Sequence, residues 1–370
     1  MIPYGRQFID KDDIKAVADV LRSDWLTQGP AVKSFEQALA NYCGAKYAVV
    51  TSNGTTGLHL AYLAAGLKKG DEVITTPNTF VATSNMLFSV GARPVFCDIR
   101  PDTFNIDETK IESLILSKTK AIVPVHFAGH SCEMDTILKI ARKHKLVVIE
   151  DACHAIGAKY KNKKIGSLSD MTVFSFHPVK PITTGEGGAV LTNNKKYYER
   201  LLRFRSHGIH KDKDGFNVML ELGYNYRMTD MQAALGESQL KKLDRFIEKR
   251  HDVVSLYEKL LGEVDEVILP KELPKNYHGW HIYVILVKNQ ETKLPLYKYL
   301  LQNGVGVNFH YPAVYSHPYY RAHGYKNMQL KNMDLYHNSC ITLPCHVGLT
   351  KNDVNKIARL VTDFFENGNR

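Results

Sequence analysis

The sequence of 370 residues has no long apolar run and only six cysteines. A membrane-spanning helix needs about 18 consecutive apolar residues, so we expect no such span and no membrane partner. The first residues, MIPYGRQFID, lack the charged and then apolar pattern of a signal peptide, which favours a cytoplasmic protein. No two cysteines form a CxxC pair, which argues against a zinc site of that type and favours reduced thiols over a disulfide framework.

Acidic residues are the scarcer charged class: the chain has 38 of them and 48 lysines and arginines, which gives a formal net charge of +10. The lysines are dispersed in pairs, and no nucleic-acid-binding motif accompanies them. We therefore expect no nucleic-acid partner. The charge is interpreted as a solvated surface, with attraction of a phosphate-bearing substrate as the alternative.

Short β-branched runs recur through the first half of the chain and predict strands. They lie at 47–50, 72–75, 94–97, 121–125, 146–149, 172–174 and 189–191. Apolar residues at helical spacing separate several of them, as in 35–42 and 60–67. This alternation indicates an α/β fold with a mostly parallel seven-stranded sheet sandwiched by helices. In such sheets, ligands bind beyond the carboxyl ends of the strands.

The character of the chain changes after about residue 240. A Lys-rich helical stretch is followed there by proline-punctuated sequence and the short strand HIYVILV. We expect a large domain over 1–248 and a smaller C-terminal α+β domain over 249–370.

The stretch SFHPVKPITTGEGGAV, residues 175–190, follows one expected strand and holds Lys180 between two prolines. Pro178 and Pro181 have fixed φ angles and restrict the backbone on both sides of the lysine. A lysine that forms an imine must be partly neutral and held against a carbonyl carbon, and burial lowers its pKa as needed. The three glycines that follow would let the main chain approach a flat ring. The alternative is a surface lysine in a turn.

Two further strand ends carry groups suited to a ligand. Asp151 follows an apolar strand, where a buried carboxylate needs a cation or hydrogen-bond donors, and a protonated pyridine nitrogen is one such partner. The stretch TSNGTTGL opens a helix whose free N–H groups at Gly54, Thr55 and Thr56 would hold a phosphate. The alternatives are an N-cap role for Asp151 and a helix start that is merely capped, by Asn53 or Thr55.

Phe80 lies just beyond another expected strand, where its ring could stack on a flat ligand; packing in the core is the alternative. An amine that captures an aldehyde, a carboxylate for a ring nitrogen, a phosphate cradle and a stacking ring match the requirements of pyridoxal phosphate (PLP). The sequence therefore predicts PLP as cofactor.

These motifs, in this order, resemble the fold-type-I PLP-dependent transferases and in particular the DegT/DnrJ/StrS family of sugar-nucleotide aminotransferases. The likeness covers nearly the whole chain. It is carried by LTQGPAVKSFEQALANYCGAKYAVVTSNGTTGLHLA, GDEVITTPNTFVATSNM, TKAIVPVHFAG, IEDACHAIGA, SFHPVKPITTGEGGAV and GYNYRMTDMQAALG.

The resemblance implies roles for individual residues. Lys180 would be the Schiff-base lysine, Asp151 the partner of the pyridine nitrogen, and Ser175 a phosphate ligand. His154 stands where many relatives have glutamine, beside the phenolic oxygen of the cofactor. Asn225, in GYNYRM, matches an asparagine that reaches the phosphate from a neighbouring subunit, so the resemblance also implies a homodimer.

Within the family, the stretches RSHGI, ELGYNYR and LPCH resemble the branch that moves an amino group from glutamate to C4 of a UDP-linked 4-keto-6-deoxy-N-acetylhexosamine. The product would be UDP-4-amino-4,6-dideoxy-N-acetyl-β-L-altrosamine, for pseudaminic acid synthesis. Segment 1–30 would contribute to the substrate site, with contacts by Tyr4, Asp24, Trp25, Leu26, Thr27, Phe309, His310 and Tyr311. Relatives tend to have HYxPxY where this chain has HYPAVY, so other 4-keto or 3-keto nucleotide sugars, as in bacillosamine, legionaminic acid or perosamine synthesis, stay open.

The resemblance implies a ping-pong reaction in which Lys180 acts as general base and acid while Asp151 keeps the ring nitrogen protonated. Related sugar dehydratases have histidine in place of the lysine, so Lys180 favours amino transfer. A non-catalytic PLP-binding regulator is the alternative from a different class. No metal is expected, because the spacing of His310, His317 and His346 matches no ligand motif.

Overall fold

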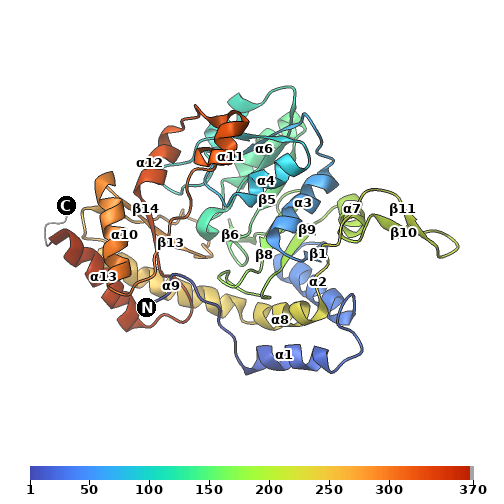
Figure 1. The fold of residues 1–370 in the computed structure, drawn as a ribbon, viewed down its shortest axis with the longest axis horizontal. Helices are drawn as coiled ribbons and strands as arrows, with labels where there is room; N and C mark the ends of the chain where they lie inside the picture. Colours follow the sequence, from blue (N-terminus) through green and yellow to red (C-terminus); the bar gives the residue numbers. More distant parts are fainter. Residues whose placement is uncertain (367–370) are drawn as a thin grey trace.

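A computed structural model describes residues 1–366 of the chain (Figure 1). Its main sheet has seven strands in the order β1-β9-β8-β5-β4-β2-β3. They are β1 Tyr47–Thr51, β2 Glu72–Thr75, β3 Arg93–Phe96, β4 Thr119–Val123, β5 Val147–Asp151, β8 Met171–Ser175 and β9 Gly188–Thr192. Only β9 runs antiparallel to its neighbours in this sheet. The expected mostly parallel seven-stranded sheet is confirmed, and each expected run contributes one strand.

Helices cover both faces of this sheet because successive strand residues, which point to opposite faces, are apolar on both sides. One face packs against α2 (Pro30–Cys43), α6 (Met134–His144) and α8 (Asp230–Leu240). The other packs against α3 (Gly54–Ala65), α4 (Ala82–Ser89) and α7 (Lys195–Arg205). Along β1, for example, Ala48 and Val50 join the first core and Val49 joins the second.

From α9 (Leu243–Leu261) onward, the chain builds another apolar core around an antiparallel sheet in the order β12-β13-β14. Its strands are β12 Val267–Ile268, β13 Tyr283–Val287 and β14 Cys340–Leu343, and its helices include α10 Lys293–Gln302 and α13 Lys351–Glu366. The buried side chains of α12 (Lys331–Ser339) belong to a neighbouring core. The expected domain boundary after residue 248 falls inside α9, and the division into two domains stays a prediction.

The N-terminal segment lies against this C-terminal part of the chain (Figure 1). The Ile2 N–H donates to the Gly304 carbonyl at 2.8 Å, and the Gly306 N–H donates to the Ile2 carbonyl at 2.7 Å. The chain then continues into α1 (Lys11–Leu21), which begins with a capping box between Asp10 and Asp13. Tyr4 is thereby held beside residues that are distant in sequence.

Two hairpins were not predicted. One is the short pair β6 (Lys159–Tyr160) and β7 (Lys163–Lys164), and the other is β10 (Ile209–Lys211) with β11 (Asn217–Met219). The second hairpin stands away from the body of the molecule (Figure 1), and its residues are exposed. Short helices α5 (Glu108–Ile111) and α11 (Pro318–Tyr320) complete the chain. Within residues 1–366, no helix is long and apolar enough to cross a membrane.

Candidate active site

A cavity of about 710 Å³ lies at the carboxyl ends of β5 and β8, between the main sheet and the segment 308–312. It brings together eleven of the predicted site residues: Tyr4, Gly54, Thr55, Phe80, Asp151, His154, Ser175, Lys180, Phe309, His310 and Tyr311. Neighbouring parallel strands end at one edge of a sheet, which explains how residues about a hundred positions apart meet here.

The start of α3 forms one wall of the cavity. Asn53 caps this helix by accepting a hydrogen bond from the Thr56 N–H at 2.9 Å, so Thr56, which was expected to be free, is engaged. Within residues 1–366, the N–H groups of Gly54 and Thr55 find no acceptor. A Cβ on Gly54 would come within 2.9 Å of the Ser175 Cβ, so only glycine lets α3 approach the end of β8 this closely. Two N–H groups, the Ser175 hydroxyl and the positive helix end fit a phosphate.

Asp151 is the last residue of β5 and is only 5% exposed. Its Oδ2 accepts a hydrogen bond from the Thr83 hydroxyl at 2.7 Å, and its Oδ1 accepts one from the Cys153 N–H at 3.2 Å. Turns and the strand β6 follow it, so the N-cap interpretation is wrong. A buried carboxylate that lines a cavity fits a cationic partner there, such as a protonated pyridine nitrogen.

Lys180 lies in the same cavity, and the surface-lysine alternative is therefore wrong. Burial lowers the pKa of Lys180 to about 8, while the nearby Cys153 and Asp151 act in the opposite direction. Its Nζ lies 3.4 Å from Nε2 of His281. An amine with this pKa is partly neutral near physiological pH, as a nucleophile or general base must be.

Histidine rings surround the lysine and are held neutral. Burial and then the charge of Lys180 lower the pKa of His154 well below its usual value, and they lower the pKa of His310 to about 3. His154 Nδ1 accepts a hydrogen bond from the Ala128 N–H at 3.2 Å, so its Nε2 carries the proton and faces the Tyr311 hydroxyl at 3.1 Å. A phenolic oxygen of a cofactor would meet a neutral imidazole here.

The sequence did not point to three of the residues that complete the cavity: Thr83, Cys153 and His281. Thr83 lies within the quoted stretch GDEVITTPNTFVATSNM, but its contact with Asp151, 68 residues away, has no signal in the local sequence. His281 lies in a run that predicts only a strand. Their contacts depend on the packing of distant segments, and no local pattern signals that packing.

The glycines after Lys180 do not line the cavity, contrary to expectation. A Cβ on Gly187 would strike the Thr184 hydroxyl and the Met228 methyl, and one on Gly188 would strike the Asn53 backbone. Gly185 has a φ of 79° and open space around it. These glycines therefore serve chain packing and a turn, and the approach to a flat ring was a wrong interpretation.

Five predicted residues lie outside the cavity of the single chain: Asp24, Trp25, Leu26, Thr27 and Asn225. Trp25 and Leu26 are 57% and 47% exposed. Thr27 pairs with Thr229, and exposed Asn225 pairs with Ser206. Within residues 1–366, no group of three or more His, Cys, Asp or Glu side chains is arranged to hold a metal ion.

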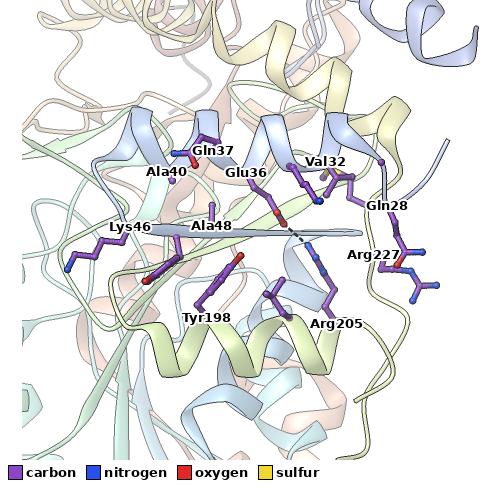
Figure 2. A pocket seen from close by; sticks show the side chains of 15 residues that line it. Gln28, Val32, Glu36, Gln37, Ala40, Lys46, Ala48, Tyr198, Arg205 and Arg227 are labelled. Carbon is purple, nitrogen blue, oxygen red and sulfur yellow. Dashed lines mark hydrogen bonds and ion pairs between the residues drawn. The ribbon is translucent and has the colours of Figure 1, made fainter. Parts of the chain in front are cut away.

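A separate cavity of about 470 Å³ lies along the open edge of β1, between α2 and α7 (Figure 2). Glu36 accepts hydrogen bonds from the Val50 N–H at 3.0 Å and from the Arg205 guanidinium at 2.6 Å. Arg205 also donates to the Val50 carbonyl at 2.9 Å. The ion pair thus satisfies both outward-facing backbone groups of Val50 on this edge strand.

The fold and the Lys180 cavity define a PLP-dependent enzyme of fold type I. The chain belongs to the DegT/DnrJ/EryC1/StrS aminotransferase family, whose model matches residues 7–362. It is therefore a PLP-dependent aminotransferase.

Similar proteins support this assignment over the full length. The chain is 42% identical to the UDP-4-amino-4,6-dideoxy-N-acetyl-beta-L-altrosamine transaminase of Campylobacter jejuni, over 95% of this chain and 94% of that protein. Helicobacter pylori PseC, an aminotransferase of pseudaminic acid biosynthesis, is 37% identical and superposes with a TM-score of 0.95 over 99% of both chains. A Streptococcus pneumoniae protein described as a sugar aminotransferase, in its PLP form, is 28% identical with a TM-score of 0.94 over 99% of both chains.

Proposed function

We propose that this chain transfers an amino group from glutamate to the C4 ketone of a UDP-linked 4-keto-6-deoxy-N-acetylhexosamine, giving UDP-4-amino-4,6-dideoxy-N-acetyl-β-L-altrosamine for pseudaminic acid and cell-surface polysaccharide synthesis in the cytoplasm. The observation that carries the proposal is that Lys180 and Asp151 share one cavity with the start of α3. The identity of 42% with the Campylobacter enzyme of that product name supports the choice of sugar.

The residues that would hold the cofactor follow from the cavity. The N–H groups of Gly54 and Thr55 and the hydroxyl of Ser175 would bind its phosphate, while Asp151 would accept a hydrogen bond from its ring nitrogen. PLP, when bound, supplies an aldehyde that takes up the amino group and a ring that accepts the electron pair of a broken C–H bond. Phe80, which is 58% exposed at the cavity mouth, would cover one face of that ring.

Lys180 would do the proton chemistry with its own ε-amine. Because its pKa is lowered to about 8, the amine can take a proton from substrate and return it without leaving the cavity. Thr83 holds Asp151 in place, and Thr83 is itself 2.7 Å from the hydroxyl of Thr79. The carboxylate thus stays oriented while Lys180 moves between its bound and free positions.

Substrate contacts would come from both ends of the chain. Tyr4 lies with its ring centroid 5.4 Å from that of His310, and both line the cavity with Phe309 and Tyr311. These residues would enclose the sugar. The exposed segment 24–27 would be completed by a second subunit.

A homodimer would also explain the position of Asn225. Tyr224 and Tyr226 stack with ring centroids 4.9 Å apart, and the Tyr226 hydroxyl lies 3.1 Å from His59 Nδ1. Successive residues of an extended segment point in opposite directions, so Asn225 would face away from its own chain. The neighbouring hairpin exposes Phe216 and nearby Leu222, each 71% exposed, as a dimer surface would before assembly.

The proposal is tested by incubating the enzyme with PLP, glutamate and a panel of 4-keto and 3-keto nucleotide sugars, with products identified by mass spectrometry and NMR. We expect amination at C4 of the UDP-linked 4-keto-6-deoxy-N-acetylhexosamine. If the enzyme instead prefers a bacillosamine, legionaminic acid or perosamine precursor, or a 3-keto sugar, that sugar is the substrate and the proposed one is wrong. No amino transfer to any sugar would favour a PLP-binding regulator.

A further inference from the structure

His281 is the hydrogen-bond partner of Lys180, yet half of its ring is left unsatisfied. Its Nε2 lies 3.4 Å from Lys180 Nζ, while its buried Nδ1 has no partner within residues 1–366. The side chain is buried, with 4% of the residue exposed. An imidazole that accepts at Nε2 carries its proton on Nδ1, and a buried donor without an acceptor is unfavourable. The folded protein therefore contains an unfavourable buried donor at Nδ1, on the ring that lies beside the lysine.

The backbone around His281 carries two further unfavourable features. Trp280 has a φ of 41°, in the left-handed region that a bulky side chain avoids. Arg250 is buried, and within residues 1–366 its hydrogen-bond partners are backbone carbonyls and no carboxylate. Its NH1 instead donates to the carbonyls of Trp280 at 3.0 Å and His281 at 3.1 Å. Several energetically unfavourable features thus coincide at residues 280 and 281, and such features cluster at functional sites.

The same contacts fix the direction of the His281 ring. The His281 N–H donates to the Ala128 carbonyl at 2.8 Å, and Arg250 holds its carbonyl. Burial, and then the charges of Lys180 and Arg250 together with the neighbouring His154 and His310, lower the pKa of His281 well below its usual value. The ring is therefore neutral and able to accept a hydrogen bond.

Other groups near Lys180 are already engaged. Both nitrogens of His154 are used, by the Ala128 N–H and the Tyr311 hydroxyl, and His310 Nδ1 faces the Thr342 hydroxyl at 2.9 Å. The groups whose charge acts on the lysine or responds to it are Asp151, Cys153, His154, His281 and His310. Among these, His281 makes the direct contact with Nζ.

We propose that His281 is a positioning residue for Lys180: its neutral Nε2 accepts a hydrogen bond from the ε-amine whenever that amine is not attached to the cofactor, and keeps it at the cavity wall. The inference rests on the proposed role of Lys180 as the cofactor lysine. Because Nδ1 has no partner to receive a proton, His281 cannot relay one to solvent. It orients the amine and stabilises its protonated form without removing the proton.

The test uses the cofactor-free enzyme and the reactivity of Lys180 toward fluorodinitrobenzene, followed by peptide mass spectrometry across pH. His281→Leu should lower the midpoint of the labelling curve by about one pKa unit, because the ammonium form loses its acceptor. His281→Gln can offer a carboxamide oxygen near the position of Nε2, so its labelling midpoint should lie close to the wild-type value. His154→Gln is the matched control, since it removes a neighbouring neutral ring that does not bond to Lys180, and its midpoint should stay at the wild-type value.

An unchanged midpoint in His281→Leu would overturn the inference, as would an equal downward shift in His281→Gln or His154→Gln. His281→Met, which also lacks a strong acceptor, replaces the leucine variant if that variant does not fold. A separate experiment tests the proposed role of Lys180. If Lys180→Ala still binds PLP covalently, Lys180 is not the cofactor lysine, and this result does not depend on His281.

Discussion

Glu150 and Asp151 are neighbours on β5 and serve opposite faces of the sheet. Asp151 lines the cavity, whereas Glu150 is fully buried on the other side. There Glu150 lies 2.7 Å from His126 Nε2, and it accepts hydrogen bonds from the Ser169 hydroxyl at 2.6 Å and the Thr172 hydroxyl at 2.9 Å. Because side chains alternate along a strand, anchoring Glu150 also fixes the direction of Asp151.

Replacing Glu150 with alanine should destabilise the fold by about 3–5 kcal/mol, because several buried polar groups lose their common partner. Urea unfolding of the cofactor-free protein measures the change. Glu150→Gln keeps the acceptor oxygen and should cost less. A loss below about 1 kcal/mol in the alanine variant would mean that this network does not hold β5.

Lys180→Ala should abolish the visible absorbance of the lysine-bound cofactor. It should also reduce turnover by roughly 10²–10⁴-fold or more, because one general acid–base group typically supplies a factor in that range. Spectra and product formation are recorded together. Lys163→Ala, at an exposed lysine on β7, is the control and should match the wild type. Turnover retained in the Lys180 variant would refute its assignment.

Asp151→Asn should slow proton abstraction from glutamate on the order of 10²-fold or more, while PLP affinity changes less, because a neutral amide no longer stabilises a protonated ring nitrogen. Rapid-mixing kinetics with α-deuterated glutamate and a PLP titration separate the two effects. Thr83→Val, which removes only the hydroxyl that orients the carboxylate, should have a smaller effect. Equal losses of affinity and rate would assign Asp151 to cofactor retention alone.

The lowered pKa of Lys180 also predicts a pH-dependent stability. The folded protein binds this proton with a pKa of about 8, below the ordinary 10.5, so the unfolded chain holds more protons between these values and stability rises with pH there. Below pH 8 the folded state bears a charge on a partly buried amine. Lys180→Met should therefore stabilise the cofactor-free protein by ~1–3 kcal/mol at pH 7, a gain that shrinks toward pH 10. Urea midpoints at both pH values test this, and a constant gain would contradict it.

Hybrid dimers test whether Asn225 acts in the neighbouring site. Lys180→Ala and Asn225→Ala chains, each inactive alone, are mixed under conditions that allow subunits to exchange. Random pairing makes half of the dimers hybrids with one intact site each, so activity should recover to about a quarter of the wild type. No recovery, with exchange verified by mass spectrometry, would place Asn225 in the site of its own chain. Full activity of Asn225→Ala before mixing would place it outside catalysis.

Local sequence predicted the strands well because most strands of the main sheet are buried on both sides and therefore read as apolar runs; the edge strand β3, with exposed Arg93, is the least buried of them. Residues that directly follow those strands, such as Asp151 and Ser175, could be assigned to the cavity for the same reason. The hairpin β10–β11 was missed because its residues are exposed and carry no alternation. His281 was missed because its role depends on Lys180, 101 positions away.

The ion pair over the open edge of β1 has a consequence beyond the single molecule. An uncovered edge strand invites strands of other chains to add to it, which is a route to aggregation. Glu36 and Arg205 occupy the outward groups of Val50 much as the backbone of an eighth strand would. At this residue, therefore, a strand of another chain would find neither a free N–H donor nor a free carbonyl acceptor to pair with.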